Sequence, residues 1–585
     1  MQPLPYIFSP HADSPQVRHF GALVAKEFRI PRQLGEIMYH RGLRTLEAVQ
    51  AFLYPQLSML PSPDSMKGIG EAVDSIVHAC TTASPIFIHG DYDVDGITAT
   101  ALLTVFFNEI GIDTHYYIPN RLEERYGLSV RSIDRLLAQS REAGRGGLLI
   151  TVDCGISAVR EVAYARERGL VVIITDHHEP QATLPCADAL LNPKQHDCRF
   201  PFSQLSGVGV AFFLIVALRK AFMERGLFAA RSLNLKKYLD LVALGTVADV
   251  VPLVGVNRIL VRAGLEVLSA KNRPGLLSLC ECCGIGHREI LAEDISFKLA
   301  PRINAAGRLG VPRLGVELLL AKDHAGARRA ADELERLNTA RKQLEGSALA
   351  AIEQQCAHQV EAGVDGLAVY HADCHPGVLG ILASKIVERF HRPAIIFTDD
   401  QQHRAGTNLK GSGRSVAGVH LFHLLEQCNG LIDQFGGHAM AVGLTIDKTL
   451  LPSFADLFNR QVTTRHAEVL RQGRGIVIDC HLTDKSILTM EFAWALRLLQ
   501  PFGEGNPEPT FLLSREQLVQ PKGVNGHLRF QLRGANGHVF PGIGFRLAPA
   551  GRNFHGSQDL VFHLKRSWFR GTEQTQIQAL HLVPH

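Results

Sequence analysis

Short apolar runs alternate with longer helical patterns between residues 84 and 178, and this alternation restricts the fold more than any other feature of the sequence. The strand-like runs are "PIFIH", "DTHYYIP", "GLLITVD" and "LVVIIT", and the helix-like segments are "ITATALLTVFFNEIG" and "AVREVAYARERG". Nearly continuous Val, Ile and Leu runs bounded by Gly and polar residues are typical of strands buried on both faces of a parallel sheet. We therefore predict a doubly wound α/β domain in this region.

Three further regions complete the predicted architecture. Residues 318–360 contain no Pro and are rich in Ala, Leu, Glu, Arg and Gln, which predicts mainly helix with a break near 323–326. "GLAVYHAD", "LGILASKIVERF" and "RPAIIFTDD" predict a second α/β unit. From about residue 473, period-two runs separated by Gly, Asn and Pro predict a small antiparallel barrel or sandwich.

The predicted fold class is therefore α/β, with two α/β lobes joined by a long helix and followed by a C-terminal antiparallel β-barrel. The expected boundaries are 1–60 for a helical N-terminal extension, 61–270 for the first lobe, 271–350 for the linking region, 351–465 for the second lobe and 466–585 for the β domain. A chain of 585 residues is long for one core, so several domains agree with its length.

Composition narrows the classes of partner and compartment. The formal net charge is +4, so a nucleic-acid partner would be held by local basic patches and not by a bulk cationic field. Without a signal-peptide pattern or an apolar run of about 18 residues, we expect a cytoplasmic protein with reduced thiols. Cys280, Cys282, Cys283 and His287 lack the paired spacing of a zinc site, which favours buried or incidental thiols.

Three aspartates, Asp91, Asp93 and Asp95, follow the strand "PIFIH" at every second position in "GDYDVDG". A parallel strand delivers the loop that follows it to the carboxyl edge of the sheet, where α/β proteins bind ligands. Crowding like charges there is costly unless a cation lies among them. The alternative is a solvated turn or an N-cap cluster, because Asp caps helices.

Further acidic and His residues follow other apolar segments. Asp153 ends a second predicted strand, Asp176, His177 and His178 follow a third, and Asp249 lies in the apolar segment "LVALGTVADVVPL". Taken singly, Asp153 is explained by a helix cap, His178 by a hydrogen-bonded core histidine and Asp249 by a turn. Because the carboxyl ends of parallel strands converge on one edge, the joint pattern instead predicts a metal cluster.

The residue types indicate the metal and the chemistry. Carboxylate and imidazole ligands without thiolate favour Mn²⁺ or Mg²⁺, with Mn²⁺ preferred because His contributes. Four or more anionic ligands suit two cations about 3.5 to 4 Å apart, which activate water and stabilise a phosphoryl leaving oxygen. We therefore predict hydrolysis of a phosphoester.

The motifs "GDYDVDG", "VDCG", "DHH" and "GTVADVVPL" resemble the four motifs of the DHH phosphoesterase superfamily, and "GGHAMAVG" at 436–443 resembles the signature of its DHHA1 domain. Their order and spacing, with the β-rich C-terminus, resemble the single-stranded-DNA-specific 5′→3′ exonucleases of that superfamily. The resemblance covers roughly residues 60–585. It implies an oligonucleotide-binding fold at the C-terminus and a hydrolase that releases 5′-mononucleotides in recombination and repair.

The resemblance also implies residue roles. His178 would be the catalytic histidine facing the leaving group, with Asp176 orienting His177. The implied ligands of two Mn²⁺ or Mg²⁺ ions are Asp93, Asp95, Asp153, His177 and Asp249, with Asp91 and His89 less firmly placed.

Phosphate contact is implied for two segments expected as loops, "LAPRINAAGRLG" and "NLKGSGRS", and for "YIPNR" and "FGGHAM", although turns and solvated surface explain the same residues. The candidates are Arg121, Arg302, Asn304, Arg308, Ser412, Gly413, Arg414, Ser415, Gly436, Gly437 and His438, with Trp568 of "HLKRSWFRG" stacking on a base.

Single-stranded DNA is the expected partner, with single-strand-binding protein, a helicase and a monomeric state implied by the same resemblance. Two other functions remain in competition. One is a DHH phosphoesterase acting on oligoribonucleotides, cyclic dinucleotides or pyrophosphate, and such enzymes are usually shorter and lack the β domain. The other is a non-catalytic scaffold that binds single-stranded DNA, and the retained metal ligands argue against it.

Overall fold

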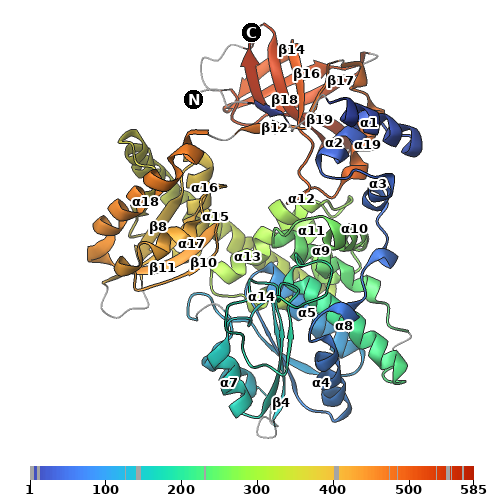
Figure 1. Cartoon of the computed structure of the whole chain (residues 1–585), viewed down its shortest axis with the longest axis vertical. Coiled ribbons are helices and arrows are strands. Elements are labelled where there is room, and N and C mark those ends of the chain that lie inside the picture. The colour runs from blue at the N-terminus through green and yellow to red at the C-terminus, as the bar shows by residue number, and fades with distance from the viewer. Residues whose placement is uncertain are drawn as a thin grey trace. The chain divides into compact units, whose positions relative to one another are not determined.

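Figure 1 shows the computed structural model of the chain. It describes residues 6–8, 14–124, 127–139, 146–229, 232–400, 407–472, 475–483, 485–534, 537–548, 554, 556–569 and 572–585. The chain divides into two compact units. One comprises Met1–Leu60, Pro252–Arg262 and Arg474–His585, and the other comprises Pro61–Val251 and Ala263–Gly473.

The first lobe of the larger unit contains a five-stranded parallel sheet. Its strands are β2 (Ile86–Gly90), β3 (Thr114–Tyr117), β4 (Gly147–Val152), β5 (Leu170–Thr175) and β6 (Ala189–Leu191), in the spatial order β3-β2-β4-β5-β6. From β2 the chain moves to one side for β3 and then crosses to the other side for β4. The strand order therefore reverses between β2 and β4, which is where doubly wound folds open a ligand crevice.

Both faces of this sheet are covered, which explains the continuous apolar runs of the sequence. Phe87, Leu149 and Val172 pack in one core with residues of α6 (Val130–Leu137) and α7 (Val159–Glu167). Alternate residues such as Ile88 and Ile150 are also fully buried. The remaining helices of the lobe are α4 (Ile69–Thr81), α5 (Val94–Glu109), α8 (Gly207–Glu224) and α9 (Leu239–Ala248), and α5 packs against both α8 and α9.

A run of helices leads from this lobe to the second one: α10 (Gly255–Ala270), α11 (Pro274–Cys282), α12 (Ala292–Asp294), a π-helical turn (Ile295–Leu299), α13 (Ala300–Arg308), α14 (Arg313–Leu320) and α15 (His324–Glu361). The predicted long helix is confirmed as α15, which has 38 residues. It contacts α11, α13 and α14 as well as β7 and α16 of the second lobe. The expected break near 323–326 is its beginning, where Asp323 accepts a hydrogen bond from the Gly326 amide.

The expectation of a loop at "LAPRINAAGRLG" is wrong, because these residues form α13. Its Gly307 is needed for packing and not for a turn. A Cβ at this position would lie 2.7 Å from the Tyr92 carbonyl oxygen. The backbone of α13 is therefore in direct contact with the backbone of the "GDYDVDG" loop. The glycine therefore permits close packing within a continuous helix.

The second lobe has a mixed five-stranded sheet in the order β10-β11-β9-β8-β7. The strands are β7 (Leu367–Tyr370), β8 (Ala394–Asp399), β9 (Asn408–Arg414), β10 (Gln434–Gly437) and β11 (Ala441–Asp447), and only the β7–β8 pair is parallel. Helices α16 (Leu379–Phe390), α17 (Leu421–Glu426) and α18 (Leu451–Gln472) complete the lobe.

The loop expected at "NLKGSGRS" is also wrong, because it forms the central strand β9, paired with β8 and β11. Gly413 lies where a Cβ would come within 3.0 Å of the side chains of Val442, Ile395 and Leu421. Close packing of the sheet explains why small residues occupy this strand.

The smaller unit joins the N-terminal helices to the C-terminal strands. Helices α1 (Pro15–Phe28), α2 (Arg32–His40) and α3 (Leu46–Leu53) share one apolar core with α19 (Met490–Ala495) and the strands. The seven-stranded sheet has the order β13-β14-β18-β19-β17-β16-β15. These strands are β13 (Cys480–His481), β14 (Phe511–Glu516), β15 (Val519–Val524), β16 (His527–Arg533), β17 (Val539–Gly544), β18 (Gln558–Phe569) and β19 (Thr572–Pro584).

The predicted fold class is confirmed, with one refinement in the β domain. The pairs β13–β14 and β17–β19 are parallel, so the sheet is mixed although its other pairs are antiparallel. A separate two-stranded sheet pairs β1 (Tyr6–Phe8) with β12 (Ile476–Ile478). Over the described part of the chain, no helix combines the length and apolar character needed to cross a membrane.

Candidate metal centre

Four polar residues lie in one row along the carboxyl edge of the parallel sheet. Gly90, Val152 and Thr175 are register partners on neighbouring strands, so the next residues, Asp91, Asp153 and Asp176, come out side by side. The Asp153 amide donates to the Thr175 carbonyl (2.9 Å) and the Asp176 amide donates to the Leu191 carbonyl (3.0 Å), which continues the row to Asn192. The register alone therefore brings together residues that are far apart in the sequence.

The first turns of two helices hold the other aspartates of the "GDYDVDG" loop. Asp93 is the N-cap of α5, and its Oδ1 accepts hydrogen bonds from the amides of Asp95 and Gly96. Asp95 accepts hydrogen bonds from the amides of Gly207 (2.6 Å) and Val208 (2.9 Å) at the beginning of α8. Both carboxylates thus lie at helix N-termini, where the backbone dipoles favour negative charge.

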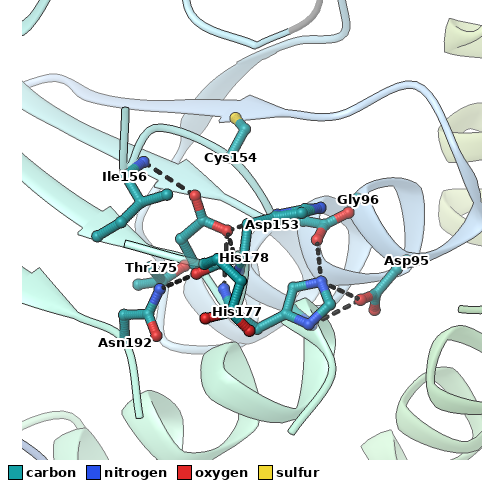
Figure 2. Close-up of polar contacts among 12 residues, drawn as sticks. Asp95, Gly96, Asp153, Cys154, Ile156, Thr175, His177, His178 and Asn192 are labelled. Atoms are coloured by element: carbon teal, nitrogen blue, oxygen red, sulfur yellow. Dashed lines mark hydrogen bonds and ion pairs between the residues drawn. The ribbon is translucent and has the colours of Figure 1, made fainter. Parts of the chain in front are cut away.

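His177 is the side chain on which the carboxylates converge (Figure 2). Its Nε2 atom lies 3.1 Å from Asp153 Oδ1, 3.5 Å from Asp249 Oδ2 and 3.8 Å from Asp95 Oδ2. Asp249 reaches this point from the C-terminal end of α9 and not from a strand. We use the name acidic cluster for the five carboxylates gathered here, Asp91, Asp93, Asp95, Asp153 and Asp249.

The donor atoms of this site fit metal ions. Three sets of side chains each bring one donor atom per residue within 4.8 Å of the others: Asp95, His177 and Asp249; Asp91, Asp93 and Asp153; and Asp153, His177 and His178. Within the described ranges, the buried atoms Asp91 Oδ1, Asp249 Oδ2 and His177 Nε2 have no hydrogen-bond partner. Oxygen and imidazole donors without thiolate suit Mn²⁺ or Mg²⁺.

The electrostatics of the site lead to the same conclusion. Burial and the neighbouring Asp93 carboxylate raise the pKa of Asp95 to about 7. Burial and nearby carboxylates also raise the pKa values of Asp91, Asp153 and Asp249 well above the usual range of an aspartate. Buried carboxylates therefore repel one another unless protons or cations compensate them.

Backbone geometry adds strain at the same place. Asp153 has φ = 61°, a left-handed conformation that costs a non-glycine residue energy. The alternative interpretation of Asp153 as a helix cap is wrong, because α7 begins only at Val159 and its N-cap is Ala158. A Cβ at Gly207 would lie 2.6 Å from Asp153 Cβ, so only glycine lets α8 begin this close.

His178 and Asp176 form a pair beside the cluster. His178 Nδ1 lies 2.8 Å from Asp176 Oδ1, which also accepts the amides of His177 (2.7 Å) and His178 (3.0 Å). Asp176 Oδ2 accepts the Ile156 amide at 2.9 Å. Burial alone would raise the pKa of Asp176, but the hydrogen bond and charge of His178 outweigh it and lower the pKa. Burial opposes protonation of His178, yet the Asp176 carboxylate keeps the pKa of the ring above its ordinary value.

His89 is placed differently from the other candidate ligands. Its side chain is fully buried, its Nδ1 atom lies 3.6 Å from Cys154 Sγ, and burial lowers its pKa to about 4. The three donor sets found in the described part of the chain do not contain it. They do not contain the "CECC" thiols either, and Cys282 donates instead to Asp332 at 3.5 Å.

Three of the predicted phosphate-binding arginines influence one another, and we call them the arginine cluster: Arg121, Arg308 and Arg414. Arg121 lies 5.3 Å over the ring of Tyr92, and Arg308 donates to the Gly377 carbonyl at 3.1 Å. Burial and the charges of Arg121 and Arg414 lower the pKa of Arg308 to about 10. Burial and Arg121 also lower the pKa of Arg414. These cations are thus partly desolvated beside one another, which favours an anion between them.

The other predicted substrate-contact residues differ from one another in their contacts. Arg302 is ion-paired with Glu335 and donates to the Lys298 carbonyl, so Arg302 binds within the helical region. Arg414 donates to the Gly413 carbonyl and to Ser412 Oγ, and Ser415 Oγ donates to the Val419 carbonyl. His438 stacks 6.1 Å from the ring of His178. Asn304 is half-buried on α13, Gly436 and Gly437 end β10, and Trp568 in β18 carries Arg566 5.1 Å above its ring.

Sequence reasoning missed the N-terminus of α8 as part of the site. The signal was "LSGVG", in which Ser206 caps the helix by accepting the Gly209 amide and Gly207 permits close approach. A Ser before a Gly-containing apolar run predicts a helix start. It does not reveal that the free amides would point at Asp95, which is more than 100 residues away.

Known proteins resemble this chain over nearly its whole length. The DHH family N-terminal domain matches residues 85–246, the DHHA1 domain 363–464 and the RecJ OB domain 478–581. "Single-stranded-DNA-specific exonuclease RecJ" of Dickeya dadantii is 39% identical over 577 residues, which cover 95% of this chain and 96% of that protein. This chain belongs to the RecJ family. The protein of the same description from Escherichia coli is also 39% identical, over 95% of this chain and 96% of its own length.

Solved structures of RecJ proteins share the fold. RecJ of Thermus thermophilus in complex with Mn²⁺ has a TM-score of 0.78 and 30% identity, covering 96% of this chain and 78% of that one. The Mg²⁺ complex of RecJ from the same organism has a TM-score of 0.73 and 29% identity, covering 97% and 77%. The metal ions of those structures are of the type that the donor set of this RecJ-family chain fits.

Proposed function

We propose that this chain is a metal-dependent exonuclease that hydrolyses phosphodiester bonds of single-stranded DNA from the 5′ end and releases 5′-mononucleotides. The observation that carries the proposal is the convergence of Asp95, Asp153 and Asp249 on His177 at the switch point of the sheet. This arrangement occurs in a chain 39% identical to single-stranded-DNA-specific exonucleases. We further propose roles in DNA recombination and repair.

Two Mn²⁺ or Mg²⁺ ions would be held by Asp93, Asp95, Asp153, His177 and Asp249, with Asp91 and His89 as further candidates. Support for two ions comes from the donor sets, because one contains Asp95, His177 and Asp249 and another contains Asp91, Asp93 and Asp153. Such ions activate water and stabilise the leaving oxygen of a phosphodiester when bound.

His178 would act at the leaving oxygen, with Asp176 as its positioning residue. The hydrogen bond from His178 Nδ1 to Asp176 orients the ring and leaves Nε2 as the nitrogen that would meet the substrate. Because the Asp176 carboxylate favours the protonated ring, His178 would present positive charge or a proton where negative charge develops. Asp176 also fixes the backbone of His177 through its amide.

The arginine cluster would bind the 5′-terminal phosphate. Burial desolvates Arg308 and Arg414, and in the absence of an anion their charges and that of Arg121 repel one another. Arg also forms bidentate hydrogen bonds with phosphate oxygens. Ser412 lies beside Arg414 on β9 and would add a hydroxyl donor. We keep Arg302, Asn304, Gly413, Ser415, Gly436, Gly437 and His438 as further substrate-contact candidates.

The remaining proposals rest on the family. The domains at 1–60, 61–270, 271–350, 351–465 and 466–585 would be an N-terminal extension, the DHH lobe, a linking region, the DHHA1 lobe and an OB-like domain that binds DNA, with Trp568 stacking on a base. Single-strand-binding protein and a helicase would be partners of a monomeric cytoplasmic enzyme.

A direct assay tests the function. Wild-type protein and Asp153→Ala would be incubated with Mn²⁺ and single-stranded or duplex DNA blocked at either end. We expect metal-dependent loss of single-stranded DNA that a 5′ block prevents, and no loss with Asp153→Ala. The matched control is Asp197→Ala, since Asp197 is an exposed aspartate of the same lobe paired with Lys67. Preferential hydrolysis of oligoribonucleotides or cyclic dinucleotides, or full activity of Asp153→Ala, would contradict the proposal.

A further inference from the structure

Phe297 is an exposed aromatic side chain close to the predicted substrate residues. It exposes 75% of its surface, although phenylalanine is among the side chains that folding most often buries. It lies in the π-helical turn Ile295–Leu299, which runs directly into α13. Single π-helical turns are rare and frequently occur at functional sites.

The helical spacing places Phe297 on the same face as two predicted DNA contacts. Phe297, Pro301, Asn304 and Arg308 follow one another at intervals of four, three and four residues, which is one side of a helix. The burial pattern agrees, because these four are exposed or half-buried. The buried positions between Phe297 and Arg308 are Leu299, Ala300, Ile303, Ala305, Ala306 and Gly307.

The far end of this face is fixed beside the metal centre. Gly307 packs against the Tyr92 carbonyl, and Arg308 donates to the Gly377 carbonyl of the second lobe. Arg308 lies eleven positions after Phe297, which corresponds to about 16 Å along a helix at about 1.5 Å per residue. This length matches at most about five stacked nucleotides at about 3.4 Å each, and fewer in an extended strand.

We propose that Phe297 is a stacking platform for a base of the substrate strand, a few nucleotides from the 5′ phosphate. The inference rests on the proposed exonuclease function and adds a residue that selects the substrate. An aromatic ring stacks on any base, so the contact tolerates sequence changes. In a duplex the bases already stack on one another, so the same contact favours an unpaired strand.

Binding measurements test the ring itself. The probe is a 5′-phosphorylated 15-nucleotide DNA with a fluorophore at its 3′ end, titrated with protein in EDTA to prevent hydrolysis and followed by anisotropy. We expect Phe297→Ala to raise Kd by about tenfold, because the change removes one base–aromatic stack. Phe297→Trp should bind within about twofold of wild type. The control Met223→Ala, which truncates an exposed apolar side chain on α8, should bind as wild type does.

An abasic scan identifies the stacked nucleotide. Oligonucleotides lacking one base at each of the first six positions would be titrated against wild type and Phe297→Ala. We expect wild type to lose affinity at one or two adjacent positions, and Phe297→Ala to lose nothing further there, because the two changes remove the same contact. Equal losses in both proteins at every position, or unchanged binding by Phe297→Ala, would overturn the inference.

The design separates this inference from the proposed function. A wild-type protein that neither binds nor hydrolyses single-stranded DNA overturns both. An active wild type without coupling between Phe297 and any base overturns only the stacking platform. If Phe297→Ala does not fold, Phe297→Leu keeps the apolar bulk without the ring and is used for the same scan, with the same outcomes.

Discussion

The acidic cluster and the arginine cluster are both groups of like charges at buried or half-buried positions of the larger unit, but they are assembled differently. The acidic cluster comes mainly from residues that follow β2 and β4, which are neighbouring strands of one parallel sheet, so the register brings them together. The arginine cluster combines a loop after β3, the end of α13 and the end of β9. The difference teaches that the register of one sheet can gather most of the proposed cation ligands, whereas the proposed anion site needs residues from two lobes.

The largest expected effect comes from removing one charge of the acidic cluster without changing its shape. Asp249→Asn should lower kcat by more than about a hundredfold, because even residues behind the metal ligands cost 10–100-fold. The same change should stabilise the metal-free protein, since it relieves carboxylate repulsion. Steady-state rates in Mn²⁺ and thermal unfolding in EDTA measure the two effects. A variant that is less active but also less stable without metal would instead indicate a structural role for Asp249.

Asp176→Asn should have an intermediate effect. The side chain accepts the His177 and His178 amides and pairs with the His178 ring, so its loss should lower kcat by about 10–100-fold while Mn²⁺ still binds. Rates at saturating Mn²⁺ and Mn²⁺ titration calorimetry separate the two quantities. Abolished Mn²⁺ binding would show that Asp176 is itself a ligand and would enlarge the acidic cluster.

Arg414→Lys tests the arginine cluster by keeping the charge and removing the planar fork. We expect KM for 5′-phosphorylated single-stranded DNA to rise by about tenfold, since a hydrogen bond to a charged group contributes about 1.5–3 kcal/mol. DNA with a 5′-hydroxyl should show a much smaller change in KM. An equal rise in KM for both substrates would show that the terminal phosphate binds elsewhere. It would contradict the proposal that the arginine cluster binds the phosphate while the acidic cluster binds the metal ions.

The two clusters also show how much of the candidate site can be predicted from the sequence. The strand ends that carry Asp91, Asp153 and Asp176 are predictable because apolar runs mark buried parallel strands, and parallel strands share one carboxyl edge. The position of Asp249 at the end of α9 follows from no local pattern, since helix packing against α5 brings it to the site. The sequence indicates its role only through resemblance to a family motif.

The structural setting of the arginine cluster is harder to predict from the sequence, for a related reason. Glycines near Arg308 and Arg414 suggested loops, whereas Gly307 and Gly413 occupy a helix and a strand where neighbouring atoms leave no room for a Cβ. Glycine marks both turns and close packing, and only the tertiary structure distinguishes the two. Arg302 looked equivalent to Arg308 in the sequence, but its ion pair with Glu335 could not be read from spacing.

The smallest expected effect concerns stability and pH. In the metal-free protein the pKa of Asp95 lies near 7, above the value of about 3.9 in an unfolded chain. A raised pKa in the folded state stabilises the fold below the unfolded value, and this contribution is lost as pH rises toward and through 7. Mn²⁺ replaces the protons, so it should raise Tm by a few degrees, and by more at pH 8 than at pH 6.

Differential scanning calorimetry with EDTA or Mn²⁺ at the two pH values measures this difference. Asp249→Asn is the informative variant, because one carboxylate fewer should reduce both the pH dependence of Tm in EDTA and the Mn²⁺ response. Arg414→Lys lies outside the acidic cluster and should keep the wild-type dependence on both. An Mn²⁺-induced shift of Tm that is the same at pH 6 and pH 8 would mean that protons do not compensate the carboxylates. The repulsion would then have to be relieved by rearrangement of the loops that carry them, and the contrast with the arginine cluster would no longer rest on charge alone.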